Sequence, residues 1–427
     1  TAFWGKLPQN KNCNNHGCSE RKRVYHVMNY VRKIREDLYW VGGNDRRIAL
    51  FENAYPVPSG MAYNSYLLLD DKNVLFDTAD RAVSENYQKN VASVLNGKPL
   101  DYLVVHHMEP DHCWAVGEMM EYYPQMKVVC TAAAMKMIGQ FFDVENLKDR
   151  VMIVAEGDTL NTGHHELTFV TAPMVHWPEV MVTYDATTKT LFSADAFGSF
   201  GAINGNLYAD EVDYEKDWLE NSRRYYTNIV GKYGVQVQAL LKKAAGLDIQ
   251  LVCPLHGLLW RENIGWLVEK YNLWSTYTPE EKGVVIAYAS IYGNTETAAN
   301  MLAGMLAERG VRNVQVFDVS ATHDSYILSA AFRFSHLVFA SITYNNGIFT
   351  NMENLLHHIA AHNLQNRTVG FIENGTWAPT SGKQMRQIIE PLKNMTILEQ
   401  MPSLKSAVKE EQYQQLEAMA DAIVAGM

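Results

Sequence analysis

Seven consecutive residues, His106-His107-Met108-Glu109-Pro110-Asp111-His112, constrain this chain more than any other stretch. Four of them have side chains of the kind that coordinate metal ions: His107, Glu109, Asp111 and His112. The run follows residues 101–105, an apolar stretch short enough to be a buried strand. Because Pro110 lacks a backbone donor, we expect an irregular loop here instead of a helix or a central strand. Ligands on such a loop can turn to two sides and serve two adjacent metals.

Three more candidate ligands follow predicted strands further along the chain: His176, Asp195 and His256. Each alone is an ordinary residue, and Asp195 by itself reads as a helix cap or a turn residue. A shared position at strand ends lets segments that are distant in sequence converge on one cleft. With the first loop they make seven ligands, enough for two metals and a bridging carboxylate.

Composition narrows the function classes. Lys and Arg number 37 against 47 for Asp and Glu, a net charge of -10, which argues against nucleic acid or an anionic membrane as partner. No apolar run reaches the length of a membrane span, and the N-terminus shows no signal-peptide pattern. The few scattered cysteines suit a reducing cytoplasm, and they do not pair as in a rubredoxin-like or zinc-ribbon module: Cys13, Cys18, Cys113, Cys130 and Cys253.

A chain of 427 residues is expected to form two or three domains. Residues 1–35 are polar and basic and predict a surface extension, although Cys13, His16 and Cys18 lie close together there. Short strands separated by turns begin at Leu38, a helix is predicted over Ser84–Leu95, and residues 214–246 and 262–275 look helical. We therefore expect one domain over residues 36–278 and another over 284–427, with a polar boundary between them.

The second domain shows strand–helix alternation. Five apolar runs predict strands near residues 284–289, 314–318, 337–340, 369–372 and 396–398, and a last helix is predicted from Lys409 to about Val424. This pattern is typical of a doubly wound parallel sheet, whose ligand site lies at the carboxyl ends of the strands.

Three loops at predicted strand ends suit a phosphate-bearing aromatic cofactor. The first has hydroxyls at both ends, a glycine, no lysine and a helix start after it, so it is a phosphate cradle and not a nucleoside-triphosphate loop. The other two offer aromatics that can stack on a flat ring. The candidate residues are Ser290, Ile291, Tyr292, Gly293, Asn294 and Thr295; Ser341, Thr343, Tyr344, Asn345, Asn346 and Gly347; and Asn374, Gly375, Thr376, Trp377 and Ala378.

The His-x-Glu-x-Asp-His loop, followed by His176, Asp195 and His256 at widening intervals, resembles the metallo-β-lactamase domain of the flavodiiron proteins, or A-type flavoproteins. The three later loops resemble the FMN site of flavodoxins. The resemblance covers about residues 38–427. It implies a metallo-β-lactamase-like αββα sandwich followed by a flavodoxin-like doubly wound parallel sheet.

The resemblance also implies roles for the seven ligands, and no catalytic residue apart from them. His107, Glu109 and His176 would hold one iron, and Asp111, His112 and His256 the other, with Asp195 bridging. Related zinc hydrolases have His where this chain has Glu109, and a carboxylate there favours iron over zinc. Cys113-Trp114 departs from the family, which often has Ser-Gly; we place Cys113 behind the ligands.

The implied activity is reduction of O2 to water, NO to N2O, or both, in the cytoplasm, with two Fe and FMN as cofactors. Two ferrous ions and reduced FMN together carry four electrons, which matches O2 reduction, whereas NO coupling needs two. The family pairs each FMN with the irons of a second subunit, so we expect a head-to-tail homodimer, or a homotetramer built from it. Without its own rubredoxin domain, the chain would take electrons from rubredoxin or a flavin-dependent reductase.

Two other functions stay open at this point. One is a zinc-dependent hydrolase of the metallo-β-lactamase fold with an appended flavodoxin-like domain. In that case Glu109 would be an unusual but tolerated substitution for the His that such hydrolases have. The other is an electron carrier that uses only the flavodoxin half, which leaves seven ligands unexplained. The sequence does not separate O2 from NO preference, although Glu52 stands near where some family members place a His.

Overall fold

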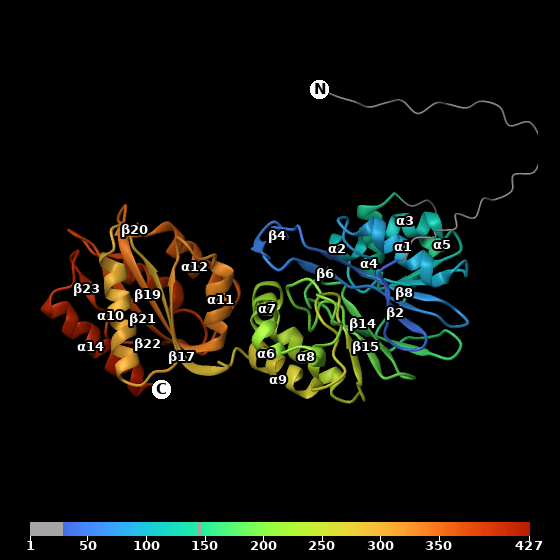
Figure 1. Cartoon of the computed structure of the whole chain (residues 1–427). Coiled ribbons are helices and arrows are strands. Elements are labelled where there is room, and N and C mark those ends of the chain that lie inside the picture. Colours follow the sequence, from blue (N-terminus) through green and yellow to red (C-terminus); the bar gives the residue numbers. More distant parts are fainter. Residues whose placement is uncertain (1–28, 144–146) are drawn as a thin grey trace, which may run out of the picture.

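The computed structural model describes residues 29–143 and 147–427, which form three main sheets with helices around them (Figure 1). The predicted features near Cys13, His16 and Cys18 lie outside these residues. Two of the sheets make up a first module and the third belongs to a second module. The predicted fold class, an αββα sandwich followed by a doubly wound parallel sheet, is confirmed.

The first sheet mixes antiparallel and parallel strands. Its order is β1 (Arg32–Lys33), β2 (Leu38–Trp40), β7 (Tyr66–Leu68), β8 (Val74–Phe76), β9 (Tyr102–Val104), β10 (Lys127–Cys130) and β11 (Val151–Ile153). The strands up to β8 pair antiparallel, as the predicted hairpins require. From β8 onward the pairing is parallel, because helices connect the strands. The sheet starts at Arg32, within the stretch predicted as an extension.

The second sheet packs face to face on the first. Its order is β12 (Thr159–Asn161), β13 (Glu166–Thr171), β14 (Met181–Asp185), β15 (Thr190–Phe192) and β16 (Leu251–Cys253). The rings of Phe76 and Phe192 stack across the interface with centroids 3.8 Å apart. Tyr66 packs on Phe192 and donates its hydroxyl to the Pro254 carbonyl at 2.6 Å. Two small ribbons extend the module: β3 (Gly43–Asp45) with β6 (Met61–Tyr63), and β4 (Leu50–Phe51) with β5 (Tyr55–Pro56).

Helices flank the two facing sheets (Figure 1). Those of the first half are α1 (Ser84–Leu95), α2 (Pro110–Cys113), α3 (Val116–Tyr122), α4 (Ala132–Phe141) and α5 (Leu147–Arg150). Those of the second half are α6 (Tyr214–Asp217), α7 (Leu219–Tyr225), a π-helical turn over Tyr226–Val230, α8 (Gly234–Ala244) and α9 (Ile264–Ser275). Among the described residues, no helix is both long and apolar enough to cross a membrane.

The second module has the strand order 2-1-3-4-5 of a flavodoxin-like sheet. The strands are β18 (Val314–Asp318), β17 (Glu281–Ala289), β19 (Phe334–Tyr344), β21 (Thr368–Asn374) and β22 (Thr396–Ile397), with β20 (Gly347–Ile348) and β23 (Ser403–Leu404) at its edge. The helices are α10 (Asn294–Glu308), α11 (Asp324–Arg333), α12 (Thr350–Ala361), α13 (Ser381–Ile389) and α14 (Glu410–Ala425). All five main strands pair parallel, which brings their carboxyl ends to one edge.

Two buried charged groups hold the segment between the modules. Glu280 accepts hydrogen bonds from Arg223, from Trp274 Nε1 at 2.7 Å and from Lys270 Nζ at 3.2 Å. Arg367 is buried and donates only to backbone carbonyls: Tyr277 and Gln365 through Nη1, Ala331 through Nε and Phe332 through Nη2. Because the Tyr277 carbonyl belongs to the linking segment, Arg367 ties that segment to the second module.

We predict that Arg367→Met lowers the free energy of unfolding of the second module by about 3 kcal/mol or more, because it leaves several buried carbonyls without a donor. Chemical denaturation followed by tryptophan fluorescence measures the effect. Arg386→Met is the matched control, since Arg386 is exposed and pairs with Glu390, the residue that directly follows the same helix. Equal stability of the two variants would contradict the structural role of Arg367.

Candidate metal centre and cofactor cleft

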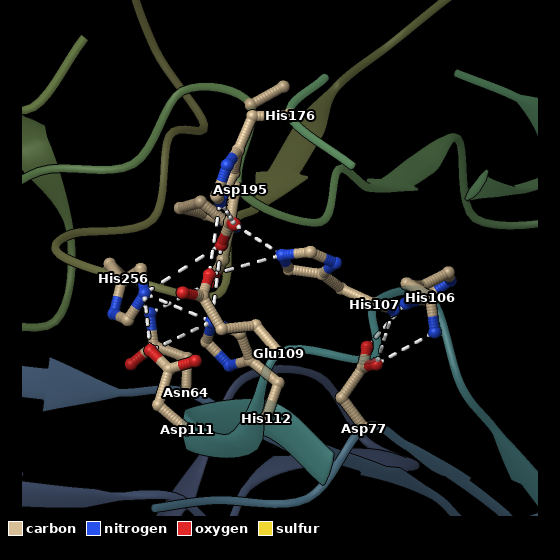
Figure 2. A network of polar contacts seen from close by, with 12 residues as sticks. Asn64, Asp77, His106, His107, Glu109, Asp111, His112, His176, Asp195 and His256 are labelled. Carbon is tan, nitrogen blue, oxygen red and sulfur yellow. Dashed lines mark hydrogen bonds and ion pairs between the residues drawn. The ribbon is translucent and has the colours of Figure 1, made fainter. Parts of the chain in front are cut away.

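The seven predicted ligands converge on one point between the two sheets (Figure 2). His107 and Glu109 follow β9, and Asp111 and His112 lie in α2. The other three come from loops that follow β13, β15 and β16: His176, Asp195 and His256. All are buried except Glu109, which is partly exposed. Loops at strand ends therefore bring the distant segments together, as expected.

Pro110 was expected to prevent a helix, and this prediction is wrong. Glu109 is extended, with φ -65° and ψ 139°, and Pro110 is the first residue of the single helical turn α2. A proline fits this position because the first residues of a helix have no intrahelical partner for their N–H groups, and because the ring fixes φ at a helical value. The turn points Asp111 and His112 to the centre, while Glu109 stays before it.

Asp195 lies in the middle of the cluster and turns one oxygen to each half (Figure 2). Its Oδ2 lies 3.3 Å from His107 Nε2 and 3.2 Å from His176 Nε2. Its Oδ1 lies 3.2 Å from His112 Nε2 and 3.7 Å from His256 Nε2. One carboxylate thus faces two pairs of imidazoles, the arrangement of a ligand between two ions.

A second carboxylate completes each half. Glu109 Oε2 lies 3.3 Å from His107 Nε2 and 3.1 Å from His176 Nε2. Asp111 Oδ2 lies 3.3 Å from both His112 Nε2 and His256 Nε2. Donor atoms about 2.0–2.2 Å from a common metal ion stand roughly 3 Å or a little more from one another. The observed separations have that size.

The cluster leaves buried oxygens without hydrogen-bond donors. Both carboxylate oxygens of Asp111 and both of Asp195 lack a partner among the described residues. Buried polar atoms are nearly always satisfied, and each exception needs an explanation. A cation supplies what hydrogen bonds do not, so these residues fit a pair of metal ions.

Outer contacts orient the imidazoles. His107 Nδ1 donates to Glu179 Oε1 at 2.8 Å, and His256 Nδ1 donates to the Ala62 carbonyl at 2.7 Å. These bonds place the proton on Nδ1 and leave Nε2 free to coordinate. The Cys113 thiol is buried and donates to the Met108 carbonyl, so it braces the ligand loop from behind, where we expected it. Glu179 was not identified from the sequence, because nothing marks one glutamate 72 residues from its partner.

Neighbouring imidazoles keep the buried Asp195 carboxylate ionised. Burial alone would raise the pKa of Asp195, but His107 and His112 hold it well below its usual value. Burial alone would lower the pKa values of His112 and His176, but neighbouring carboxylates raise each to about 9. The carboxylates are Asp111 and Asp195 for His112, and Asp195 and Glu109 for His176. In the absence of a cation, the imidazoles and carboxylates of the cluster therefore compensate one another's charge.

A cavity of about 650 Å³ leads to this cluster, and we call it the metal cleft. Its lining combines three of the ligands with neighbouring polar and apolar residues: Glu109, Asp111, His176, Ile48, Leu50, Phe51, Glu52, Asn53, Tyr63, Asp80, Pro110, Trp177, Asn228 and Ile229. Glu52 enters the cleft from the hairpin of β4 and β5. Burial and the charge of Glu109 raise the pKa of Glu52 to about 8.

The second module has a cavity of about 560 Å³ at the carboxyl ends of its strands, which we call the cofactor cleft. Every cofactor-binding residue predicted from the sequence lines it except Gly293, Ser341 and Gly347. Gly293 has φ +88° at the start of α10, a conformation that favours glycine, and its N–H donates to Ser290 Oγ. Ser341 is buried beneath the loop, and Gly347 pairs with Tyr344 in the hairpin closed by Asn345 and Asn346.

Ile342 and Ser406 also line the cofactor cleft and were not predicted. The Ser406 N–H donates to Asn374 Oδ1, and Asn374 Nδ2 donates back to the Ser406 carbonyl. Ser406 follows β23, a two-residue strand parallel to β21 that is too short to show an apolar pattern. Ser406 could have been predicted only as part of the residue group after one more strand, and the sequence does not show that strand.

Exposed aromatic side chains rim the cofactor cleft. Tyr292 is 92% exposed and Trp377 is 86% exposed, and Tyr344 and Ile291 are also exposed. Such side chains normally bury their area against a flat ligand or another protein surface. The described lining contains hydroxyls, amides and aromatics but no charged side chain.

Comparisons with known proteins agree with this architecture. A family model described as ODP family beta lactamase matches residues 61–257, and one described as flavodoxin matches residues 286–410. An anaerobic nitric oxide reductase flavorubredoxin of Escherichia coli is 31% identical over 81% of this chain and 72% of its own length. The solved rubredoxin:oxygen oxidoreductase of Desulfovibrio gigas superposes with a TM-score of 0.86 at 29% identity, covering 93% of this chain and 98% of that one.

The fold is shared more widely. The crystal structure of a flavodiiron protein from Giardia intestinalis superposes with a TM-score of 0.84 at 22% identity, again over 93% of this chain and 98% of that one. The two relatives whose names state an activity are both oxidoreductases. With its β-lactamase-like module, its flavodoxin module and the paired ligand clusters between the facing sheets, the chain belongs to the flavodiiron proteins, oxidoreductases that combine a diiron centre with FMN.

Proposed function

We propose that the seven converging side chains hold two iron ions and that the enzyme reduces O2 to water, NO to N2O, or both, at this pair. His107, Glu109 and His176 would hold one ion, and Asp111, His112 and His256 the other. The observation that carries the proposal is the position of Asp195, whose two oxygens each face one half of the cluster at 3.2–3.7 Å.

The donor set suits iron better than zinc. It combines four imidazoles with three carboxylates and contains no thiolate, since Cys113 hydrogen-bonds to the backbone instead. When bound, two ferrous ions together with reduced FMN supply four electrons for O2 reduction or two for NO coupling. This supports the oxidoreductase over the zinc hydrolase with an appended flavodoxin-like module.

The protein's own contribution is orientation and enclosure. Glu179 and the Ala62 carbonyl fix the rings of His107 and His256, so ligand geometry is set before any ion binds. Six of the seven ligands are buried, and small molecules would enter the metal cleft past Glu52 and Trp177. Enclosure limits access to small substrates, which O2 and NO are.

The cofactor cleft fits FMN. The N-terminus of α10, preceded by Ser290 and Gly293, suits the phosphate, because backbone N–H groups at a helix start attract anions. Tyr344 and Trp377 lie on the rim where a flat ring can stack. The absence of a charged side chain from the described lining leaves phosphate recognition to hydroxyls and backbone amides.

Electron delivery in this proposal uses a second subunit. The exposed Tyr292 and Trp377 are well placed to pack on another chain, and we propose a head-to-tail homodimer in which each FMN serves the irons of the partner. The names of two relatives mention rubredoxin, which supports a rubredoxin-type donor, with a flavin-dependent reductase as the other candidate. Cytoplasmic location stays a prediction.

The activity is tested by anaerobic reduction followed by stopped-flow mixing with O2 and with NO. We expect rapid reoxidation of the flavin by at least one substrate, with water or N2O as product and two irons per chain. A protein that carries zinc without iron and is not reoxidised by either gas would contradict the proposal and favour a hydrolase.

We predict that Asp195→Ala removes at least half of the bound iron and abolishes turnover, because both halves of the cluster lose a shared ligand. Iron content by plasma mass spectrometry and FMN content by absorbance are measured on the same sample. Asp80→Asn is the control, since Asp80 lines the same cleft but is not in either ligand group. Two irons and normal turnover in Asp195→Ala would refute the bridging role.

We predict that Trp377→Ala slows electron transfer from FMN to the metals while both cofactors stay bound, because Trp377 lies on the rim that faces a partner in the proposed dimer. The readout is the steady-state rate, with iron and FMN contents as the check on loading. Tyr413→Ala tests for a general effect of removing an exposed aromatic side chain, as Tyr413 lies on α14 away from the cofactor cleft. An unchanged rate in Trp377→Ala counts against this electron route.

A further inference from the structure

A cluster of titratable side chains lies on the second module where it meets the first. His358 Nδ1 approaches Asp324 Oδ2 at 2.9 Å, an ion-pair contact and not an aligned hydrogen bond, and His323 Nδ1 lies 3.1 Å from Asp324 Oδ1. The ring of His362 lies edge-on to that of His358, with centroids 4.4 Å apart. These residues lie on or directly beside α11 and α12 and do not line the cofactor cleft. The side chains of His358, Asp324 and His323 are partly exposed to solvent.

Asn228 connects this cluster to the metal cleft. It lies in the π-helical turn Tyr226–Val230 and lines the cleft together with Glu109 and His176. Its backbone carbonyl accepts from His362 Nε2 at 3.1 Å and from the Tyr55 hydroxyl at 3.4 Å. Its side-chain Oδ1 is buried and has no partner among the described residues, which leaves an acceptor for water. Short π-helical turns are frequent at functional sites.

Tyr55 stands between the two regions. It belongs to the hairpin that begins with β4, which reaches from the first module toward α11 and α12 (Figure 1) and carries Glu52 into the metal cleft. Burial, together with the smaller effects of the Glu52 and Asp324 charges, raises the pKa of Tyr55 to about 12. The Tyr55 hydroxyl therefore keeps its proton at neutral pH. Tyr55 and His362 both bond to the Asn228 carbonyl, and the His362 ring packs on that of His358, so these contacts connect Tyr55 to the cluster.

The proposed reaction needs protons at a buried place. Reduction of one O2 to two waters consumes four protons, and coupling of two NO to N2O and water consumes two. Six of the seven ligands are buried and Glu109 is partly exposed, so protons have to be carried from solvent to the metals by side chains and water. Tyrosine, histidine and carboxylate groups joined by water carry out such transfer in proteins.

We propose that the Asp324–His358 pair and the Tyr55 hydroxyl, joined by water, form a proton route from solvent to the metal cleft. The route rests on the proposed reductase function. In each transfer the His358 imidazolium gives up one proton, the Tyr55 oxygen accepts one and its O–H releases one toward the cleft. His358 then takes a proton from solvent, so the route returns to its starting state with no net change in charge or bonds.

The charged and titratable groups that face the route are His323, His362, Glu52 and Arg224. Arg224 is buried above the Tyr326 ring and donates to the Pro56 carbonyl and Ser325 Oγ, so a fixed cation lies beside the hairpin. Burial, and secondarily the charge of His358, lower the pKa of His362, which leaves His358 as the more accessible proton carrier of the two.

Tyr55→Phe and His358→Ala test the route in the iron- and FMN-loaded enzyme. We expect turnover with O2 or NO to fall by about tenfold at pH 8 and less at pH 6, with iron and FMN contents unchanged. Added imidazole should restore His358→Ala but not Tyr55→Phe. His357→Gln is the matched control, because His357 precedes His358 on α12 but is exposed and outside the cluster. Wild-type rates and pH profiles in both variants would overturn the route.

A second measurement does not depend on activity. Histidine NMR titrations of the full chain should show that His358→Gln raises the pKa of His362, since the charge of His358 is removed. An unchanged His362 titration would overturn the coupling within the cluster. If wild-type protein reduces neither gas, the proposed function fails, whereas wild-type turnover with unaffected variants rejects the proton route alone.

Discussion

The Asp195 carboxylate, held between four imidazoles in the interior, is the interaction on which the rest of this structure depends. Burying an ionised carboxylate is costly unless charge compensates it. Here both of its oxygens lack hydrogen-bond donors, and the nearest groups are imidazole nitrogens that also face Glu109 or Asp111. Three carboxylates and four imidazoles this close together are unfavourable as a protein core and favourable as a cage for two cations. The binding of two cations therefore explains why these charged groups lie together in the interior.

The fold makes the cage possible because two sheets meet with their loops at one end. The loop after β9 and the turn α2 each supply two ligands, and the other three lie on loops after β13, β15 and β16. The stacked Phe76 and Phe192 and the Tyr66–Pro254 hydrogen bond fix the sheets against each other just beneath the site. Between the two modules, Arg367 and Glu280 hold the linking segment in place. The second module therefore keeps its position beside the hairpin that carries Glu52 and Tyr55.

Much of this was predictable because chemistry and periodicity are local in sequence. The ligand-rich loop and the strand–helix alternation after residue 283 indicated both modules, and the helix over Ser84–Leu95 has the predicted bounds. The predictions that failed concerned features that depend on backbone conformation or tertiary packing. Pro110 starts a helix because the preceding Glu109 is extended, a backbone state that residue types alone do not fix. Ser406, Glu179 and Asn228 gained their positions from tertiary packing, and β23 is too short to have a pattern. The contacts around Tyr55 join segments more than 170 residues apart.

The central claim is that two irons lie on either side of Asp195. Anomalous diffraction from crystals of the iron-loaded protein, collected on both sides of the iron absorption edge, tests it most directly. The account predicts two iron peaks, one among His107, Glu109 and His176 and one among Asp111, His112 and His256, with Asp195 between them. A single peak, or peaks elsewhere with Asp195 touching neither, would contradict it.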